Sequence, residues 1–347
     1  MALTDLVALS LLPVTWWRQI AARLRTGWSA ADLLETLVLE RDTAATPADL
    51  RASAARALAA AKLAGAAPIP WSASEYPPLL AAIADPPPVL WVAGCLDVLR
   101  PPAVAIVGSR AGSPYALAVA ERLAADLVSR GVVVVSGLAR GVDSAAHRGA
   151  LEADGATIGV LGCGVDLVYP SEHRALAGEM RRRGAVVSEL VPGTPPLPHF
   201  FPLRNRIISG LSRAIVVIEA GEKSGSLITA RLALEQGRDV LAVPGNVLNG
   251  RNRGGHALLR DGAKVVETAD DILEELNVPA PGTGIVAQPS AAAADPLLAC
   301  LPAGECCDLD AIVDRSGVTI ERVLPRLLDL ELRGLVRRAG GGRFVRI

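Results

Sequence analysis

The middle of the chain alternates short Val/Ile-rich runs with segments of helical length, and this alternation constrains the fold more than any other feature. A strand that is apolar on both faces is typical of a parallel sheet, because helices cover both of its sides. Strands that alternate with helices predict an α/β fold with a doubly wound, mostly parallel, Rossmann-like sheet. The expected strands lie at 103–107, 132–136, 156–161, 185–188, 214–218, 239–243 and 263–266.

The N-terminal part has a different texture. Leucines recur at helical spacing around 33–38, and an alanine-rich run follows over 50–67, so residues 1–70 predict a helical domain. Residues 71–277 are the expected α/β domain. It opens with a proline-rich connection that extends to 88 and cannot be regular helix.

The C-terminal part predicts a further small domain. Residues 278–294 have the Pro, Gly, Ser and Ala composition of a linker. Within 295–347, we expect a helix near 308–315, a turn at Gly317, a second helix capped by Thr319 and a hairpin folded at 340–342. Helix, turn, helix and hairpin together suggest a winged helix.

Charge and cysteine content exclude several classes of protein. The formal net charge is -1, so a nucleic-acid site would have to be a local concentration of positive charge. The five cysteines are an odd number without zinc-knuckle spacing, which predicts reduced thiols and neither a metal site nor a cofactor. Asp5, Pro13 and Arg18 interrupt the N-terminal apolar run, so we expect no secretion signal, no membrane span and a cytoplasmic location.

Glycines and basic side chains follow the expected strands. In an open parallel sheet, the loops at the carboxyl ends of strands share one edge, where ligands bind. Glycine lets backbone N–H groups approach an anion, and Arg and Lys supply fixed charge. The sequence therefore predicts a phosphate-binding edge. Its candidate nucleic-acid-binding residues are Gly108, Ser109, Arg110, Arg140, Phe200, Phe201, Arg204, Asn205, Arg206, Lys223, Ser224, Gly225, Ser226, Asn246 and Arg251.

Several of these residues have other interpretations. Arg110 could cap a helix or pair with a glutamate, and Arg204 and Arg206 could lie on a solvated face. Phe200 and Phe201 could stack on bases or pack under the sheet. Among the histidines, His147 is expected to pack or hydrogen-bond within its helix instead of catalysing a reaction.

Signatures of catalysis are missing from the same loops. No pair of carboxylates stands out as acid and base, and no Ser lies in a Gly-x-Ser-x-Gly elbow. The run at 221–224 ends like a nucleotide-binding phosphate loop, but it lacks the Gly before Lys and the leading Gly. We therefore expect a site that holds phosphate without breaking bonds, and a protein that is not an enzyme.

The motifs together resemble those of the DprA/Smf family of DNA-processing proteins. The resemblance is dense across the expected α/β domain and loose over the first 70 residues. It is carried by Gly-Ser-Arg at 108–110, Ser-Gly-Leu-Ala-Arg-Gly at 136–141, Tyr-Pro at 169–170, Phe-Pro-Leu-Arg-Asn-Arg at 201–206, Ser-Gly-Ser at 224–226 and Pro-Gly at 244–245.

This resemblance implies a sterile-alpha-motif-like N-terminal domain, an extended Rossmann-like domain and a winged helix. It also implies binding of single-stranded DNA, a homodimer formed through the Rossmann-like domain, and loading of the RecA recombinase onto incoming strands during natural transformation. The DNA-contacting positions of the family correspond here to Arg110, Lys223 and Arg251, and its Arg-Asn-Arg motif corresponds to Arg204 and Arg206.

The sequence departs from the family pattern at three places. Ala116 stands where the family has Gly, and His256 stands where Asn is common. Pro325 lies inside the second helix of the expected winged helix and should kink or break it.

Two other functions fit parts of the sequence. A nucleoside-monophosphate phosphoribohydrolase would use a similar phosphate edge with a catalytic Glu, for which Glu219 is the candidate, although its Pro-Gly-Gly loop is missing here. A transcription regulator would read duplex DNA with the winged helix. The expected second helix mixes acidic and basic side chains and so has little net field, which favours a protein-contact or accessory role.

Overall fold

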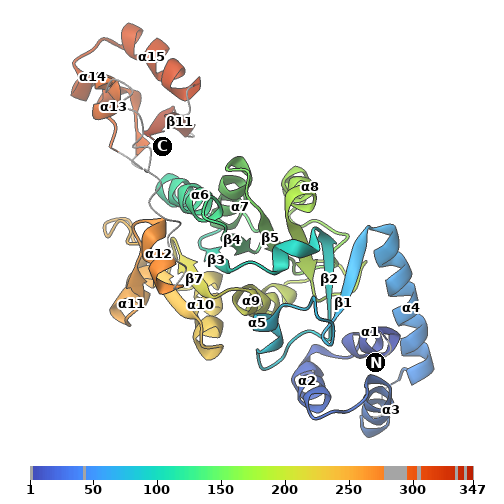
Figure 1. Ribbon diagram of the computed structural model, residues 1–347. Helices are drawn as coiled ribbons and strands as arrows, with labels where there is room; N and C mark the ends of the chain where they lie inside the picture. Colours follow the sequence, from blue (N-terminus) through green and yellow to red (C-terminus); the bar gives the residue numbers. More distant parts are fainter. Residues whose placement is uncertain are drawn as a thin grey trace.

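The computed structural model describes residues 3–41, 44–276, 295–302, 306–332, 335–339 and 342–346. It consists of an N-terminal group of helices, a central α/β unit and a small C-terminal unit (Figure 1). The expected linker at 278–294 lies outside the described residues.

The described residues of the central unit form one nine-stranded sheet in the order β1-β2-β6-β5-β4-β3-β7-β8-β9. The strands from β3 to β9 pair in parallel, which confirms the doubly wound, mostly parallel fold. All seven expected strands are present, some shorter by one or two residues. Their bounds are β3 (Ala103–Val107), β4 (Val133–Ser136), β5 (Thr157–Val160), β6 (Ala185–Ser188), β7 (Ala214–Val217), β8 (Asp239–Ala242) and β9 (Lys264–Val265).

Two antiparallel strands extend the sheet and were not expected from the sequence. β1 (Ala66–Pro70) pairs with β2 (Val89–Gly94), and β2 pairs with β6. β1 contains two prolines, which an edge strand tolerates because the side that lacks an N–H donor can face away from the ladder. The sheet thus begins at Ala66, before the domain boundary expected after residue 70.

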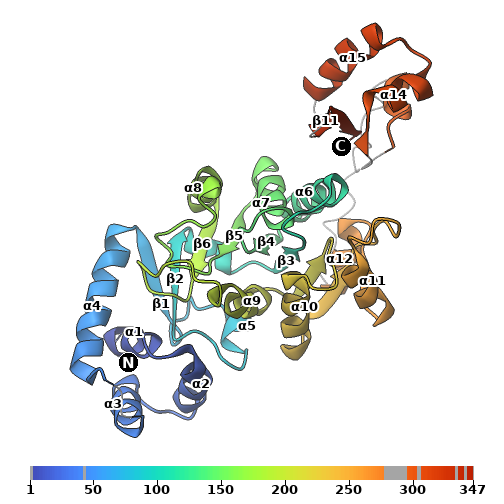
Figure 2. The same ribbon diagram turned by 180° about the vertical axis from the view of Figure 1, so that it is seen from behind.

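Helices cover both faces of the sheet (Figures 1 and 2). Val104 and Ile106 of β3 pack with α6 (Pro114–Val128), α7 (Val142–Glu152) and α12 (Ala269–Glu275). The alternate residues Ala105 and Val107 pack with α5 (Pro78–Ala81), α9 (Phe200–Leu211) and α10 (Gly225–Glu235). The remaining helices of this unit are α8 (Arg174–Arg183) and α11 (Arg253–Arg260). This two-sided burial explains why the strands lack a polar face.

The N-terminal unit is helical, as predicted. It contains α1 (Leu3–Ser10), a short 3-10 turn, α2 (Trp17–Arg25), α3 (Ala30–Glu40) and α4 (Pro47–Leu63). Ser29 caps α3, and Thr46 forms a capping box with Asp49 at the start of α4. Buried leucines such as Leu6 and Leu33 share one apolar cluster with Ala66 of β1 and Trp91 of β2, so these helices pack on the end of the sheet that β1 closes.

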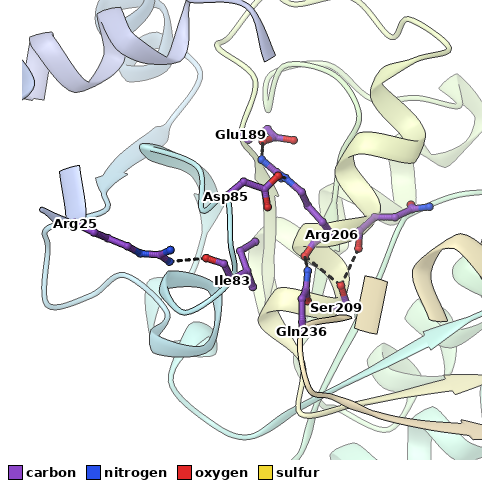
Figure 3. Close-up of polar contacts among 8 residues, drawn as sticks. Arg25, Ile83, Asp85, Glu189, Arg206, Ser209 and Gln236 are labelled. Carbon is purple, nitrogen blue, oxygen red and sulfur yellow. Dashed lines mark hydrogen bonds and ion pairs between the residues drawn. The ribbon is translucent and has the colours of Figure 1, made fainter. Parts of the chain in front are cut away.

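A buried arginine of the α/β unit and an exposed arginine of α2 link the N-terminal helices to the α/β unit (Figure 3). Arg206 of α9 donates to Asp85 (Nε to Oδ2, 2.9 Å) and to Glu189 (Nη2 to Oε2, 2.6 Å), and its guanidinium lies 5.7 Å from the ring centre of Trp17 in α2. Arg25 of α2 donates to the carbonyl of Ile83. Burial raises the pKa of Glu189, and the charge of Arg206 opposes that shift. We call Arg206, Asp85, Glu189, Trp17 and Arg25 the junction cluster.

The C-terminal unit is a winged helix, as expected. It contains α13 (Pro296–Ala299), α14 (Leu309–Ser316), α15 (Ile320–Leu332) and a three-stranded sheet in the order β10 (Cys306–Cys307), β12 (Arg343–Arg346), β11 (Val336–Ala339). Gly317 ends α14 in the left-handed conformation, at φ +64°. The bend expected at 340–342 includes residues 340 and 341, which lie outside the described residues. The winged helix contacts α6 through an ion pair between Arg337 and Glu121 (2.9 Å).

Of the two effects expected of Pro325, a kink or a break in the second helix of this unit, the break is wrong. α15 continues through Pro325 to Leu332. Proline removes a single backbone bond, the one that its N–H would donate to the carbonyl of Glu321. Glu321 is exposed, so water can satisfy that carbonyl. In the described residues, no helix combines the length and the apolar character that crossing a membrane requires.

Candidate nucleic-acid interface

A cavity of about 790 Å³ opens where the direction of the sheet's winding reverses. The chain passes from β3 to β4 on one side, while β7 pairs with β3 on the other. Ligands of doubly wound sheets bind at this switch point, beside the carboxyl ends of the strands. Ten of the fifteen candidate residues line the cavity, namely Gly108, Ser109, Arg110, Phe201, Arg204, Asn205, Lys223, Ser224, Gly225 and Ser226.

The Gly-Ser-Arg loop after β3 forms one wall. Gly141, from the loop after β4, has φ +75°, and a Cβ there would lie 2.3 Å from the carbonyl oxygen of Ser109. Only glycine permits this approach, which packs the two loops together. Arg110 is exposed and forms no ion pair within the described part of the chain, so its charge faces the cavity without a protein counter-ion.

An aromatic group lies beside Arg110. The guanidinium of Arg110 lies 5.8 Å from the ring centre of Phe201. The ring centre of Tyr169 lies 5.3 Å from the same ring centre. Tyr169, Phe201 and Arg110 therefore form one group of two neighbouring aromatic rings and one cation. Planar rings next to a cation provide surfaces on which nucleic-acid bases stack.

Phe200 and Phe201 lie in different environments. The ring centre of Phe200 lies 4.2 Å from that of His199, with the two rings tilted by 51°, and Phe200 packs against the apolar cluster that includes the N-terminal helices. Phe201 lines the cavity. Phe200 thus packs within the fold, and stacking of Phe201 on bases stays a prediction.

Arg204 is buried beneath the cavity. Its Nη1 atom donates to the carbonyl of Gly137 (2.7 Å) and also contacts the carbonyl of Val160. Asp143 lies close to it and accepts from the backbone N–H of Gly137 (3.1 Å). Burial lowers the pKa of Arg204 to about 10, whereas the charge of Asp143 raises it. Arg204 thus holds the strand-end loops in place from below while still lining the cavity.

The loop after β7 forms another wall. Ser224 caps α10, whose first residues Gly225 and Ser226 line the cavity. Lys223 is exposed, and no hydrogen bond or ion pair holds it within the described residues. A helix N-terminus with a lysine before it favours an anion at this wall.

Glu219 is engaged within the protein. Its carboxylate accepts from the backbone N–H of Ser113 (3.1 Å) and from the Ser113 hydroxyl (2.7 Å). Glu219 is buried. Both of its oxygens therefore anchor the start of α6.

Five candidate residues do not line the cavity. Arg251 is nearby on the rim, where its Nη1 atom donates to the carbonyl of Ala111 (2.9 Å), and Asn246 is exposed on the same loop. Arg140 pairs at the surface with Glu172, and Phe200 packs as described above. Arg206 is buried in the junction cluster.

The candidates at 200–206 lie on a helix and not in a strand-end loop, and this explains the different positions of Arg204 and Arg206. The segment starts α9. Successive helical residues are turned by about 100°, so two residues that are two positions apart point to nearly opposite sides. Phe201, Arg204, Asn205 and Ile208 share the cavity face, while Arg206 points to the junction.

Sequence reasoning missed several residues of the cavity. Tyr169 belongs to the Tyr-Pro motif, and Asp143 follows the motif at 136–141 by two residues, but neither was assigned to the site. The helical period on α9 and α10 would have found Ile208, Ile228 and Thr229, which also line the cavity. No group of three or more His, Cys, Asp or Glu side chains that could hold a metal ion occurs within the described ranges.

Known proteins are similar to this chain in sequence and in fold. The family model for DNA recombination-mediator protein A matches residues 68–277, and the DprA winged helix domain matches residues 284–342. Protein Smf of Escherichia coli is 41% identical over 288 residues, which are 80% of this chain and 77% of that protein.

Two solved structures superpose on the chain. The X-ray structure of DNA processing protein A from Streptococcus pneumoniae has a TM-score of 0.67 and 35% identity, covering 79% of this chain and 98% of that one. The second structure is of DNA processing protein A from Helicobacter pylori, studied for its single-stranded DNA binding mode. It has a TM-score of 0.55 and 29% identity, covering 61% of this chain and 95% of that one.

Proposed function

Because the chain belongs to the DprA/Smf family of DNA-processing proteins, we propose that the cavity at the switch point binds single-stranded DNA. One observation carries the proposal. Arg110 and Lys223 are exposed cations that line the same cavity, and the rings of Phe201 and Tyr169 lie beside Arg110. The cations attract the phosphates of the backbone, and the aromatic rings offer surfaces on which unpaired bases stack. Contacts of these two kinds favour a single strand and tolerate any base sequence.

The protein acts by binding and not by catalysis. Glu219, the candidate acid of the phosphoribohydrolase alternative, has both oxygens occupied by Ser113. A catalytic carboxylate would need at least one oxygen directed at the substrate. Release of adenine and ribose 5-phosphate from AMP by the purified protein would contradict this part of the proposal.

The bound strand is handed to RecA, and a homodimer formed through the Rossmann-like domain holds it. Two cavities on one strand would raise the apparent affinity through effective concentration. We expect sedimentation to give twice the mass of the chain. We also expect the protein to stimulate ATP hydrolysis by RecA on DNA already covered by a single-strand-binding protein. A cytoplasmic location is part of the same proposal, because RecA acts on DNA there.

The test of DNA binding is the anisotropy of labelled oligo-dT over a salt series. Wild-type affinity should fall with salt at a slope of about -0.7 per phosphate contact. Arg110→Ala removes one cation, so binding should weaken about tenfold at low salt and the slope should flatten by about 0.7. Arg56→Ala is the matched control, because Arg56 is an exposed arginine on α4, remote from the cavity.

Three outcomes would contradict the proposal. Wild type could fail to bind oligo-dT even at low salt, or Arg56→Ala could weaken binding as much as Arg110→Ala. Duplex DNA could also compete as well as the single strand. The first result would direct attention to a small phosphate ligand, and the last to the winged helix.

A further inference from the structure

The loop after β8 carries two neighbouring apolar side chains in solvent. Val247 is 76% exposed and Leu248 is 92% exposed. β8 is the neighbour of β7 in the sheet, so this loop leaves the same edge as the cavity walls. Its last part reaches the rim, where Arg251 donates to the carbonyl of Ala111 in the loop after β3 (2.9 Å).

Side-chain amides hold this loop in shape. Asn252 is buried at its base, accepting from the backbone N–H of Ala220 (2.9 Å) and donating to the carbonyl of Val243 (3.0 Å). Further along, Asn246 accepts from the N–H of Leu248 (2.8 Å), and Asn249 accepts from the N–H of Arg251 (3.0 Å). These Asx turns fix the backbone on both sides of the tip. The loop therefore holds Val247 and Leu248 away from the apolar core.

Exposed apolar residues also occur elsewhere, for example Leu39 and Leu63 on the N-terminal helices. Single exposed leucines need no explanation. The tip of this loop differs because two apolar residues are adjacent, are carried by a braced loop, and lie next to exposed cations. Aliphatic side chains in such a place pack on the faces of bases or enter between base steps, as they do in proteins that unstack nucleic acid.

We propose that Val247 and Leu248 form an apolar wedge that packs against the bases of a single strand whose phosphates are held at the rim. The inference rests on the proposed function and adds a contact for the bases outside the cavity. Arg110 and Arg251 hold the backbone, and the wedge separates two neighbouring bases. Because an apolar contact releases no counter-ions, it contributes affinity without changing the salt slope.

The test is the double variant Val247→Ser/Leu248→Ser in the full chain, with two readouts. The first is oligo-dT affinity over a salt series. We expect binding about three- to tenfold weaker at every salt concentration, with an unchanged slope. The second is the fluorescence of oligo-dT containing one 2-aminopurine at successive positions. Wild type should change the fluorescence at one position in particular, and the double variant should lose that change.

Two control variants test whether the effect depends on the position and on the apolar character of the two side chains. Leu39→Ser/Leu63→Ser removes equally exposed apolar side chains far from the cavity and should bind as wild type does. Val247→Ile/Leu248→Met keeps the tip apolar and should retain both affinity and the fluorescence change. Urea unfolding of each variant shows whether its fold is intact.

The outcomes separate this inference from the proposed function. If wild type does not bind oligo-dT, the proposed function itself fails. If wild type binds and the Ser/Ser variant has the same affinity and fluorescence, the wedge is overturned while DNA binding stands. A changed sedimenting mass of the Ser/Ser variant with unchanged fluorescence would also overturn the wedge, because the tip would then contact protein.

Discussion

The cavity and the junction cluster use basic side chains in opposite ways. At the junction, Arg206 is buried and paired with Asp85 and Glu189. At the cavity, Arg110 and Lys223 are exposed and both line the open space. A buried guanidinium without partners would be costly, so Arg206 depends on its carboxylates. An exposed guanidinium is solvated at little cost and remains available for a phosphate.

The two regions are linked by one helix. α9 presents Phe201 and Arg204 to the cavity and Arg206 to the junction. Arg204 combines both situations, because it is buried yet lines the cavity. From this comparison we expect junction variants to change stability, cavity variants to change DNA binding, and Arg204 variants to change both.

Arg206→Ala should have the largest effect on stability. It leaves Glu189 buried without its counter-charge, which typically costs about 3–5 kcal/mol. The free energy of unfolding in urea measures this loss. The double variant Arg206→Ala/Glu189→Ala should be less destabilised than the sum of the two single variants, because it removes both charges. Wild-type stability in Arg206→Ala, together with loss of oligo-dT binding, would show that Arg206 contacts DNA after all.

Arg204→Ala should affect both stability and binding. It removes the bonds to the carbonyls of Gly137 and Val160 and leaves Asp143 buried without a nearby cation. We expect a loss of about 3 kcal/mol in unfolding free energy and weaker oligo-dT binding, because the strand-end loops lose their support. Asp143→Asn in the same chain should restore part of the stability. If Arg204→Ala changes only one of the two properties, α9 does not link the regions as described.

The neighbouring phenylalanines allow a sharper form of the comparison. Phe201→Ala should weaken oligo-dT binding by about 1–3 kcal/mol, the usual range for one stacked base, without changing the salt slope. Phe200→Ala should leave binding nearly unchanged and lower the unfolding free energy, because it leaves a gap in the apolar cluster. Anisotropy and urea unfolding of both variants are the measurements. Equal effects of the two variants on binding would contradict the different placements of the rings.

A buried histidine predicts how stability depends on pH. The hydroxyl of Thr157 donates to the carbonyl of Val134, so His147 must donate from Nδ1 to Thr157, which leaves its Nε2 unprotonated and without a partner in the described residues. Burial lowers the pKa of His147 to about 3. Between pH 6.5 and about 3, the unfolded chain binds a proton at this residue that the folded chain does not.

This residue therefore destabilises the fold as pH falls through that window, by about 1.4 kcal/mol for each pH unit. His147→Asn keeps an N–H donor and cannot titrate, so its unfolding free energy should fall less steeply with acid. Urea unfolding of both proteins at pH 7, 6 and 5 gives the comparison. Equal pH dependence in the two proteins would mean that His147 is protonated in the folded state.

The sequence predicted the sheet and much of the cavity, because both depend on local patterns. Apolar runs mark buried parallel strands, and the residues after those strands necessarily share an edge. β1 and β2 were missed because their pairing depends on a partner distant in the chain and because β1 contains prolines. The role of Arg206 was missed because an Arg-Asn-Arg sequence gives no sign of its helical phase or of the carboxylates of Asp85 and Glu189, which reach it only in the fold.

Hydrogen exchange of the backbone amides, with and without oligo-dT, tests the central claim most directly. If the exposed cations at the switch point bind the strand, DNA should slow exchange in residues 108–111 and 221–226. Peptides from the N-terminal helices and the segment around Asp85 should change little. Protection confined to the winged helix, or spread over the junction and absent from both cavity loops, would contradict the assignment of the DNA site to this cavity.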